Sequence, residues 1–190
     1  MIKFMITTSF GLESLVKWQL KDMGYENFKL SDGQIILDAN LDDVGKLNIN
    51  LREADRVYLI LKTFEAKDFD QLFEGIKAIN WSDFLDKDSN FIVSARTYKS
   101  KLFSVRTIQS ISEKAIVESM KTKYKISHFS KSSHRVQIEV SINKNIASIL
   151  IDTSGEGLHK RGYREDSVKA PLRENLAAGL VDLSFYKPDR

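Results

Sequence analysis

The segment from Gly157 to Arg164 combines the side chains that grip a phosphate backbone. Arginine guanidinium groups fork onto phosphate oxygens, a lysine adds a point charge, and a tyrosine ring can stack on an unpaired base. We therefore expect nucleic-acid contacts from five residues of the segment: His159, Lys160, Arg161, Tyr163 and Arg164. The alternative is that Leu158 and Tyr163 pin the segment to the protein while its cations stay solvated.

A second group of cations is spread between residues 96 and 135. Three lie at the end of an expected strand, one starts the next helix, and two lie in the polar loop before a later strand. We expect phosphate contacts from these residues too: Arg96, Lys99, Lys101, Arg106, Lys131 and Arg135. Each of them has a plain alternative as a solvated surface cation.

Charge is distributed unevenly along the 190 residues. Residues 1–95 carry 11 Lys and Arg against 16 Asp and Glu, residues 96–164 carry 14 against 5, and residues 165–190 carry 4 against 5. A polyanion-binding segment needs clustered cations, so we expect the positive charge of the middle segment to gather on one face. A solvated, lysine-rich surface would have the same composition.

Residue types for covalent or metal chemistry are sparse. The chain has no cysteine, and the spacing of His128, His134 and His159 matches no metal motif. Glycine loops of the nucleotide-binding kinds are also missing from the sequence. We therefore expect no catalytic centre, no metal and no cofactor within this chain. The lack of cysteine, and of any apolar run near the roughly 20 residues that span a bilayer, fits a cytoplasmic protein with no membrane partner.

The first 65 residues alternate between strand and helix patterns. The apolar spacing predicts strands over 3–8, 27–30, 34–38 and 56–63 and amphipathic helices over 12–23 and 41–51. The resulting order, β-α-β-β-α-β, is the ferredoxin-like plan.

The next 90 residues have a different order of elements. Asp68 and Ser104 are placed to cap two helices, the second of them long. A strand is expected over 91–97, strict alternation from Val136 to Ile142 predicts a half-buried strand, and 146–151 is apolar enough for a central strand. The order α-β-α-β-β, added to the first unit, gives an α+β protein.

A last helix is expected after the polar linker 162–169. Pro171 suits a first helical turn, where its missing N–H costs nothing. Leucines follow at helical spacing and form an apolar stripe that needs a partner surface: Leu172, Leu176, Leu180 and Leu183. In the isolated chain this helix should be mobile unless a dimer or the protein's own core covers it.

Two stretches, Asp152–Arg164 and Ala170–Ala178, closely resemble the junction between the THUMP and catalytic domains of bacterial THUMP-containing guanine-N2 methyltransferases of large-subunit ribosomal RNA. The resemblance extends to the whole chain in element order. It implies that the N-terminal domains grip folded RNA for a C-terminal domain that depends on S-adenosylmethionine. The family's cofactor loop, of the Asp-Pro-x-x-Gly-x-Gly kind, and its Asn-Pro-Pro-Tyr-type loop do not occur before Arg190. The family's activity therefore cannot be carried onto these residues.

Together these observations predict a ferredoxin-like domain over 1–65, a THUMP-like domain over 66–155, and a linker with one helix over 156–190. The expected function is recognition of folded RNA, by shape and phosphates, for a ribosomal RNA methyltransferase. The expected partners are ribosomal RNA and an absent methyltransferase domain docked on the helix 172–183, through which the chain could also dimerise. The alternatives are a free-standing THUMP adaptor that recruits a separate RNA-modifying enzyme, and a protein-interaction module with incidental basic charge.

Overall fold

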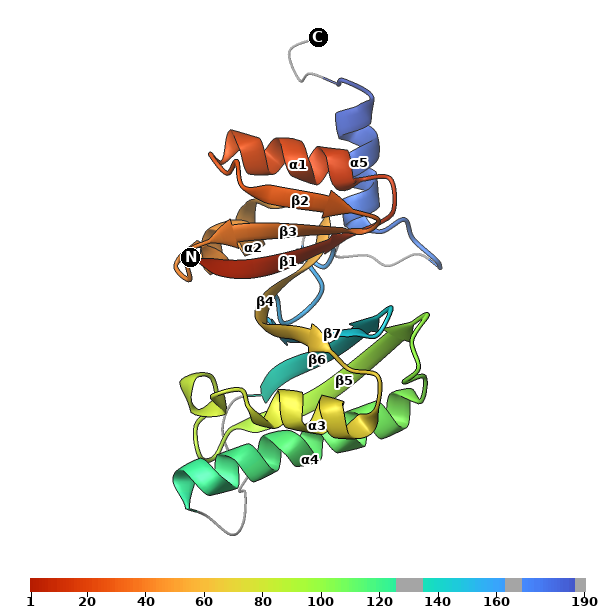
Figure 1. Ribbon diagram of the computed structural model, residues 1–190. Helices are drawn as coiled ribbons and strands as arrows, with labels where there is room; N and C mark the ends of the chain where they lie inside the picture. The colour runs from red at the N-terminus through yellow and green to blue at the C-terminus, as the bar shows by residue number, and fades with distance from the viewer. Residues whose placement is uncertain (126–134, 163–168, 187–190) are drawn as a thin grey trace. The chain divides into compact units, whose positions relative to one another are not determined.

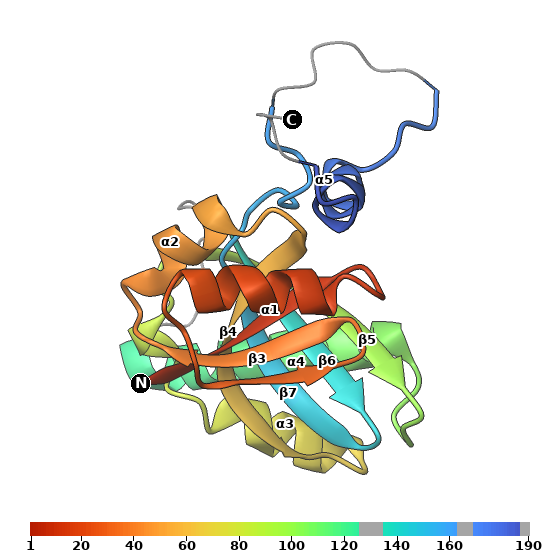
Figure 2. The ribbon, with the colours of Figure 1, turned by 90° about the horizontal axis from the view of Figure 1, so that it is seen from above.

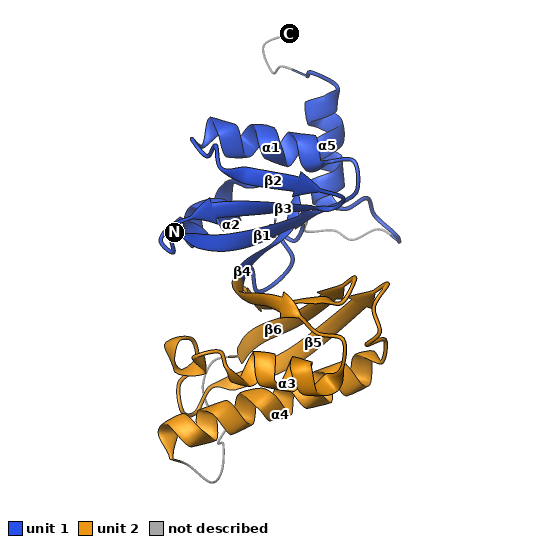
Figure 3. Ribbon diagram, in the orientation of Figure 1, with its two compact units in different colours: residues 1–59, 153–190 blue, residues 60–152 orange. Residues whose placement is uncertain are grey.

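A computed structural model describes residues 1–125, 135–162 and 169–186 of the chain. The chain forms two compact units, one from residues 1–59 and 153–190 and one from residues 60–152 (Figure 3). Strand β4 (Ala54–Glu65) passes from the first unit into the second.

Unit 1 is built around an antiparallel sheet with the strand order β2-β3-β1-β4 (Figure 1). Alternate residues of β1 and β3 are fully buried, among them Phe4, Ile6 and Leu37, as the two-residue period of a strand requires. Helices α1 and α2 add Leu20 and Leu47 to the buried set. The other elements of this part are β1 (Ile2–Thr8), α1 (Glu13–Asp22), β2 (Phe28–Ser31), β3 (Gln34–Ala39) and α2 (Asp43–Asn50).

Unit 2 has the strand order β4-β7-β6-β5, with β5 parallel to β6 and β6 antiparallel to β7. Helices α3 and α4 lie along one face of these strands (Figure 1). Its elements are α3 (Phe69–Lys77), a short 3-10 turn (Trp81–Asp83), β5 (Asn90–Tyr98), α4 (Val105–Tyr124), β6 (Arg135–Asn143) and β7 (Ile146–Asp152). The core joins Leu72 and Ile76 of α3 to Ile116 of α4 and Val140 of β6. Both expected element orders and the α+β class are confirmed.

The predicted caps of α3 and α4 are present. The Asp68 carboxylate accepts a hydrogen bond from the Gln71 N–H at 2.8 Å, and the Ser104 hydroxyl accepts one from Thr107. These caps satisfy N–H groups that lack a partner in the first helical turn. One detail of α2 differs from the expectation, because Leu41 lies before the helix and is exposed.

Helix α5 (Glu174–Leu183) differs from the expected last helix in two respects. It begins at Glu174 rather than at Pro171, and the residues that it buries are Asn175 and Gly179, not the leucine stripe. A Cβ atom on Gly179 would lie 2.8 Å from Leu12, so the helix backbone approaches the start of α1 closely. Figures 1 and 2 both show α5 beside this end of α1. Of the leucine stripe, Leu180 and Leu183 remain exposed on α5, Leu176 is partly buried, and Leu172 lies before the helix.

Among the residues that the structure describes, no helix is both long and apolar enough to cross a membrane.

Candidate nucleic-acid interface

The loop between β5 and α4 is held in one shape by its own polar groups. The Thr97 hydroxyl donates to the Leu102 carbonyl at 2.6 Å, and the Leu102 side chain is buried beneath the loop. The Ser100 hydroxyl donates to the Tyr98 carbonyl at 2.8 Å. Lys99 adopts a left-handed backbone with φ 45°, which turns the chain out of the strand. Because the backbone is satisfied locally, the loop's charged side chains are left to face solvent.

The turn between β6 and β7 is tied to this loop. The Lys144 N–H donates to the Tyr98 carbonyl at 3.0 Å, and the Lys101 N–H donates to the Asn145 side chain at 2.8 Å. The Asn145 N–H donates in turn to the Ser100 hydroxyl at 3.0 Å. The parallel pairing of β5 with β6 ends at Tyr98 opposite Asn143, which brings the two connections together.

Exposed cations and aromatic rings gather on this paired loop and turn. Phe103 is 80% exposed and Tyr98 is 58% exposed, and the Lys99 ammonium group lies 5.2 Å from the centre of the Tyr98 ring. These exposed cations form no ion pair or side-chain hydrogen bond with a residue that the structure describes. We call this set the cationic loop: Tyr98, Lys99, Lys101, Phe103, Arg106 and Lys144.

Cations beside solvent-facing aromatic rings are typical of binding sites for single-stranded nucleic acids. The cationic groups neutralise phosphates, and the rings stack on bases. Three members of the cationic loop were not expected from the sequence: Tyr98, Phe103 and Lys144. The rings could have been found only by asking which apolar residues near a basic loop stay exposed. Lys144 could be found only from the pairing of distant strands.

Arg96 lies on the same strand, but its charge is already engaged. Its Nε is 2.8 Å from a carboxylate oxygen of Glu139 and 3.0 Å from the Ser141 hydroxyl. The expected phosphate contact of Arg96 stays a prediction, and it would compete with this ion pair.

The remaining cations of unit 2 do not join the cationic loop. Arg135 pairs with Asn90 at the start of β5, whereas the cationic loop lies beyond its end. Lys121 and Lys123 lie in the last turn of α4, opposite the helix end that carries Arg106. These three cations thus lie at the end of unit 2 away from the cationic loop. That the positive charge of residues 96–164 gathers on one face stays a prediction. Lys131, Tyr163 and Arg164 lie outside the described residues.

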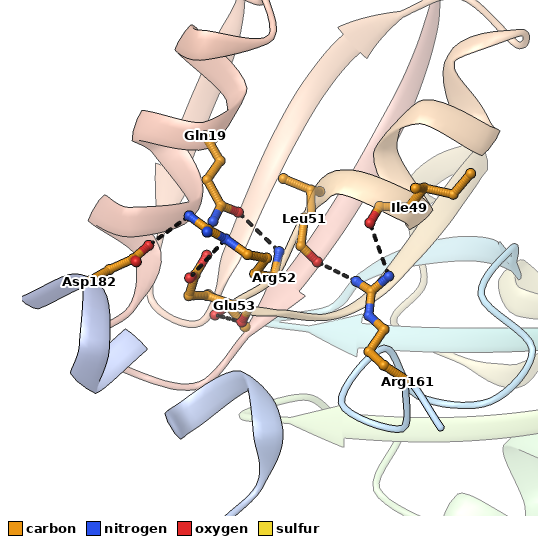
Figure 4. A network of polar contacts seen from close by, with 8 residues as sticks. Gln19, Ile49, Leu51, Arg52, Glu53, Arg161 and Asp182 are labelled. Carbon is orange, nitrogen blue, oxygen red and sulfur yellow. Dashed lines mark hydrogen bonds and ion pairs between the residues drawn. The ribbon is translucent and has the colours of Figure 1, made fainter. Parts of the chain in front are cut away.

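Arg161 caps the end of α2. Its guanidinium group donates to the carbonyl groups of Asn48, Ile49, Leu51 and Leu158 at 2.5–3.1 Å (Figure 4 shows Ile49, Leu51 and Arg161). The bonds to Asn48, Ile49 and Leu51 satisfy carbonyl groups that are left without helical partners at the C-terminus of α2, and the bond to Leu158 lies within the linker. Four of the five guanidinium N–H groups are used in this way.

The rest of the linker, residues 153–162, is bound to unit 1 as well. Side chains of Thr153 and Ser154 bond to Asn48 and to backbone groups of Val57, and Arg56 donates to the Gly155 carbonyl. The His159 ring lies against Gly157, where an added Cβ would be 2.6 Å from it. Lys160 is exposed. The expected nucleic-acid contacts of His159, Lys160 and Arg161 stay predictions.

No group of three or more His, Cys, Asp or Glu side chains that could hold a metal ion occurs within the part of the chain that the structure describes.

Family models give the two domains their identity. Residues 3–58 match the RlmL ferredoxin-like domain, and residues 66–152 match the THUMP domain. The chain is an RlmL-type ferredoxin-like domain followed by a THUMP domain. The cationic loop lies inside the matched THUMP domain, and the linker follows it.

Longer proteins carry the same pair of domains. The chain is 40% identical over 97% of its length to YpsC of Bacillus subtilis, which is named as an RNA methyltransferase, and covers 48% of that protein. It is 30% identical over 93% of its length to ribosomal RNA large subunit methyltransferase K/L of a Marinomonas species and covers 24% of it. A solved relative is a predicted N6-adenine-specific DNA methylase from Listeria monocytogenes, with TM-score 0.94 and 39% identity over 100% of this chain and 50% of its own. The chain thus spans between a quarter and a half of these relatives.

Proposed function

We propose that this chain is the RNA-binding portion of an S-adenosylmethionine-dependent ribosomal RNA guanine-N2 methyltransferase. The observation that carries the proposal is the cationic loop, where four exposed cations flank two exposed rings on a THUMP domain. Such a site binds RNA through phosphates and stacked bases, without the hydrogen-bonding groups that read a long sequence.

The cationic loop favours an unpaired stretch of RNA over a regular duplex. Bases in a duplex are stacked on one another, so Tyr98 and Phe103 can reach a base only in a loop, bulge or end. The fixed backbone of the loop lowers the entropy lost on binding, because the backbone need not be ordered first. A hairpin loop of ribosomal RNA is the ligand that uses both parts of the site.

The methyltransferase assignment extends beyond the residues of this chain. It places the cofactor site and the reacting groups in a catalytic domain that docks on the outer side of α5. Leu180 and Leu183 of α5, and Leu172 just before it, are each about half exposed, which an adaptor that works alone would not need. This stripe favours the enzyme over the adaptor. The alternative is a dimer of the chain that forms through the same stripe. A cytoplasmic location belongs to the same proposal.

Salt titration of RNA binding tests the function. With four cations on phosphates, the logarithm of the binding constant should fall against the logarithm of salt concentration with a slope of about −3. A triple variant that replaces Lys99, Lys101 and Lys144 by Gln should bring the slope to about −1. The ligand is a ribosomal RNA hairpin with an unpaired loop.

A matched control removes the same charge elsewhere. Lys3, Lys21 and Lys29 are exposed lysines of unit 1, and replacing them by Gln should leave the slope near that of the unchanged protein. Equal slopes for the two triple variants would remove the cationic loop from the site. Tighter binding of a DNA hairpin of the same sequence would contradict the RNA assignment.

A further inference from the structure

Glu53 places a carboxyl group in the interior of unit 1. Its side chain is 0% exposed, and neither carboxyl oxygen accepts a hydrogen bond from a donor among the described residues. An ionised carboxylate in such a place loses its hydration without replacement. Another interaction must therefore offset the free-energy cost of burying this carboxyl group.

Helix α5 supplies a second carboxyl group. The carboxyl groups of Asp182 and Glu53 lie beside the same guanidinium group, that of Arg52. Arg52 stands beside both, with its guanidinium 3.0 Å from Asp182 and 3.9 Å from Glu53 (Figure 4).

The other described neighbours of the pair are neutral. From α1, the Gln19 amide oxygen accepts the Arg52 N–H, and from β1, the Thr8 hydroxyl donates to the Glu53 backbone carbonyl. Arg52 is therefore the one charged group of these contacts that opposes the two carboxylates, and most of its side chain is in solvent. A single, partly solvated cation cannot neutralise two ionised carboxylates, whereas one added proton brings the three groups to neutrality.

We propose that protonation of Glu53, beside Asp182, fastens α5 to unit 1, so that the helix is released as the pH rises towards neutrality. Contacts elsewhere on α5 do not depend on this proton. The Asn175 amide donates to Asp55 at 2.7 Å, and Gly179 packs on Leu12.

The electrostatics agree with this arrangement. Burial, and then the negative charge of Asp182, raise the pKa of Glu53 from 4.5 to about 7, against the smaller opposing effect of the Arg52 charge. The pKa of Glu53 is therefore higher while α5 is docked than after the helix has been released and water reaches the carboxyl group. Docking is then strongest below pH 4.5, weakens as the pH rises to about 7, and levels off above that.

Hydrogen exchange of the α5 amides in the whole chain measures the release. After correction for intrinsic exchange, protection of Glu174–Leu183 should fall between pH 5 and 7, by at most about 300-fold, since each unit of pKa shift gives a factor of ten. Glu53→Gln keeps the shape of the side chain without the charge. It should hold protection at the acid level up to pH 8.

A second variant separates loss of the proton from loss of a contact. Asp55→Asn changes the other polar attachment of α5, so it should alter protection by the same factor at every pH. A pH dependence that persists in Glu53→Gln would overturn the proposal, as would pH-independent protection in the unchanged protein. Should Glu53→Gln fail to fold, the 13C resonance of the Glu53 carboxyl in the unchanged protein decides. A titration midpoint near 7 supports the proposal and one near 4.5 overturns it.

Discussion

The cationic loop and the linker are both basic, and both were expected to bind nucleic acid, yet they use their cations differently. In the cationic loop, Ser100 and Asn145 satisfy the backbone, so the charged side chains face solvent. In the linker, the guanidinium group of Arg161 satisfies the backbone itself, at the open end of α2. Positive charge therefore stays available to a ligand only where no nearby carbonyl groups need a donor.

The largest expected effect is a loss of folding stability on substitution of Arg161, the cation that satisfies backbone carbonyl groups. Arg161→Ala should lower the free energy of unfolding by roughly 2 to 4 kcal/mol, because four carbonyl groups lose a charged donor. Arg161→Lys should lose most of the same stability, since an ammonium group cannot reach four carbonyls in a plane. Urea unfolding measures both. Lys160→Ala is the neighbouring control and should change stability by less than about 0.5 kcal/mol. Full stability of Arg161→Lys would show that charge alone matters here.

A smaller effect is expected at Phe103, one of the two rings of the cationic loop. Phe103→Ala should weaken binding of an RNA hairpin by about 1 to 3 kcal/mol, the range for one stacked base, without a change in the salt slope. Stability should be unaffected because the ring is 80% exposed. Binding is measured by fluorescence anisotropy. Phe10→Ala removes a ring that is 83% exposed in unit 1 and should leave the affinity unchanged. Equal losses for the two variants would mean that exposed rings act nonspecifically.

The smallest effect is expected at Arg96. Its ion pair with Glu139 already occupies the guanidinium, so Arg96→Gln should change the RNA salt slope by less than about half a unit. Lys101→Gln, which removes an unpaired cation from the adjoining loop, should change it by about one unit. Parallel titrations of the two single variants give the comparison. The reverse order would mean that RNA displaces Glu139 and that Arg96 belongs to the interface.

Short-range features of the fold could be predicted from the sequence. The caps at Asp68 and Ser104 were predictable because a cap and the N–H that it accepts are three residues apart. The strands were predictable because alternation shows in neighbouring residues. The boundaries drawn at residues 65 and 155 stay a prediction.

Helix α5 shows where sequence reasoning stopped. Its leucine spacing predicted a helix with an apolar stripe that needs a partner surface, and that docking stays a prediction. The spacing did not indicate the face that packs on unit 1, which carries Asn175 and Gly179. Those residues pack well because a glycine lets the helix approach Leu12 and an amide reaches Asp55. Neither contact can be predicted from the sequence of the helix, because each depends on a residue of unit 1 that is distant along the chain.

The sequence by itself determined the order of the elements, the uneven charge and the resemblance to THUMP methyltransferases, since all of these depend on residue type and on spacing along the chain. Only the tertiary structure decided which cations are free. The pairing of β5 with β6 brought Lys144 to the loop at Lys101, and the open end of α2 engaged Arg161. Both outcomes depend on backbone groups that are far away along the chain. A buried polar group pairs with whichever partner is close to it in the folded structure.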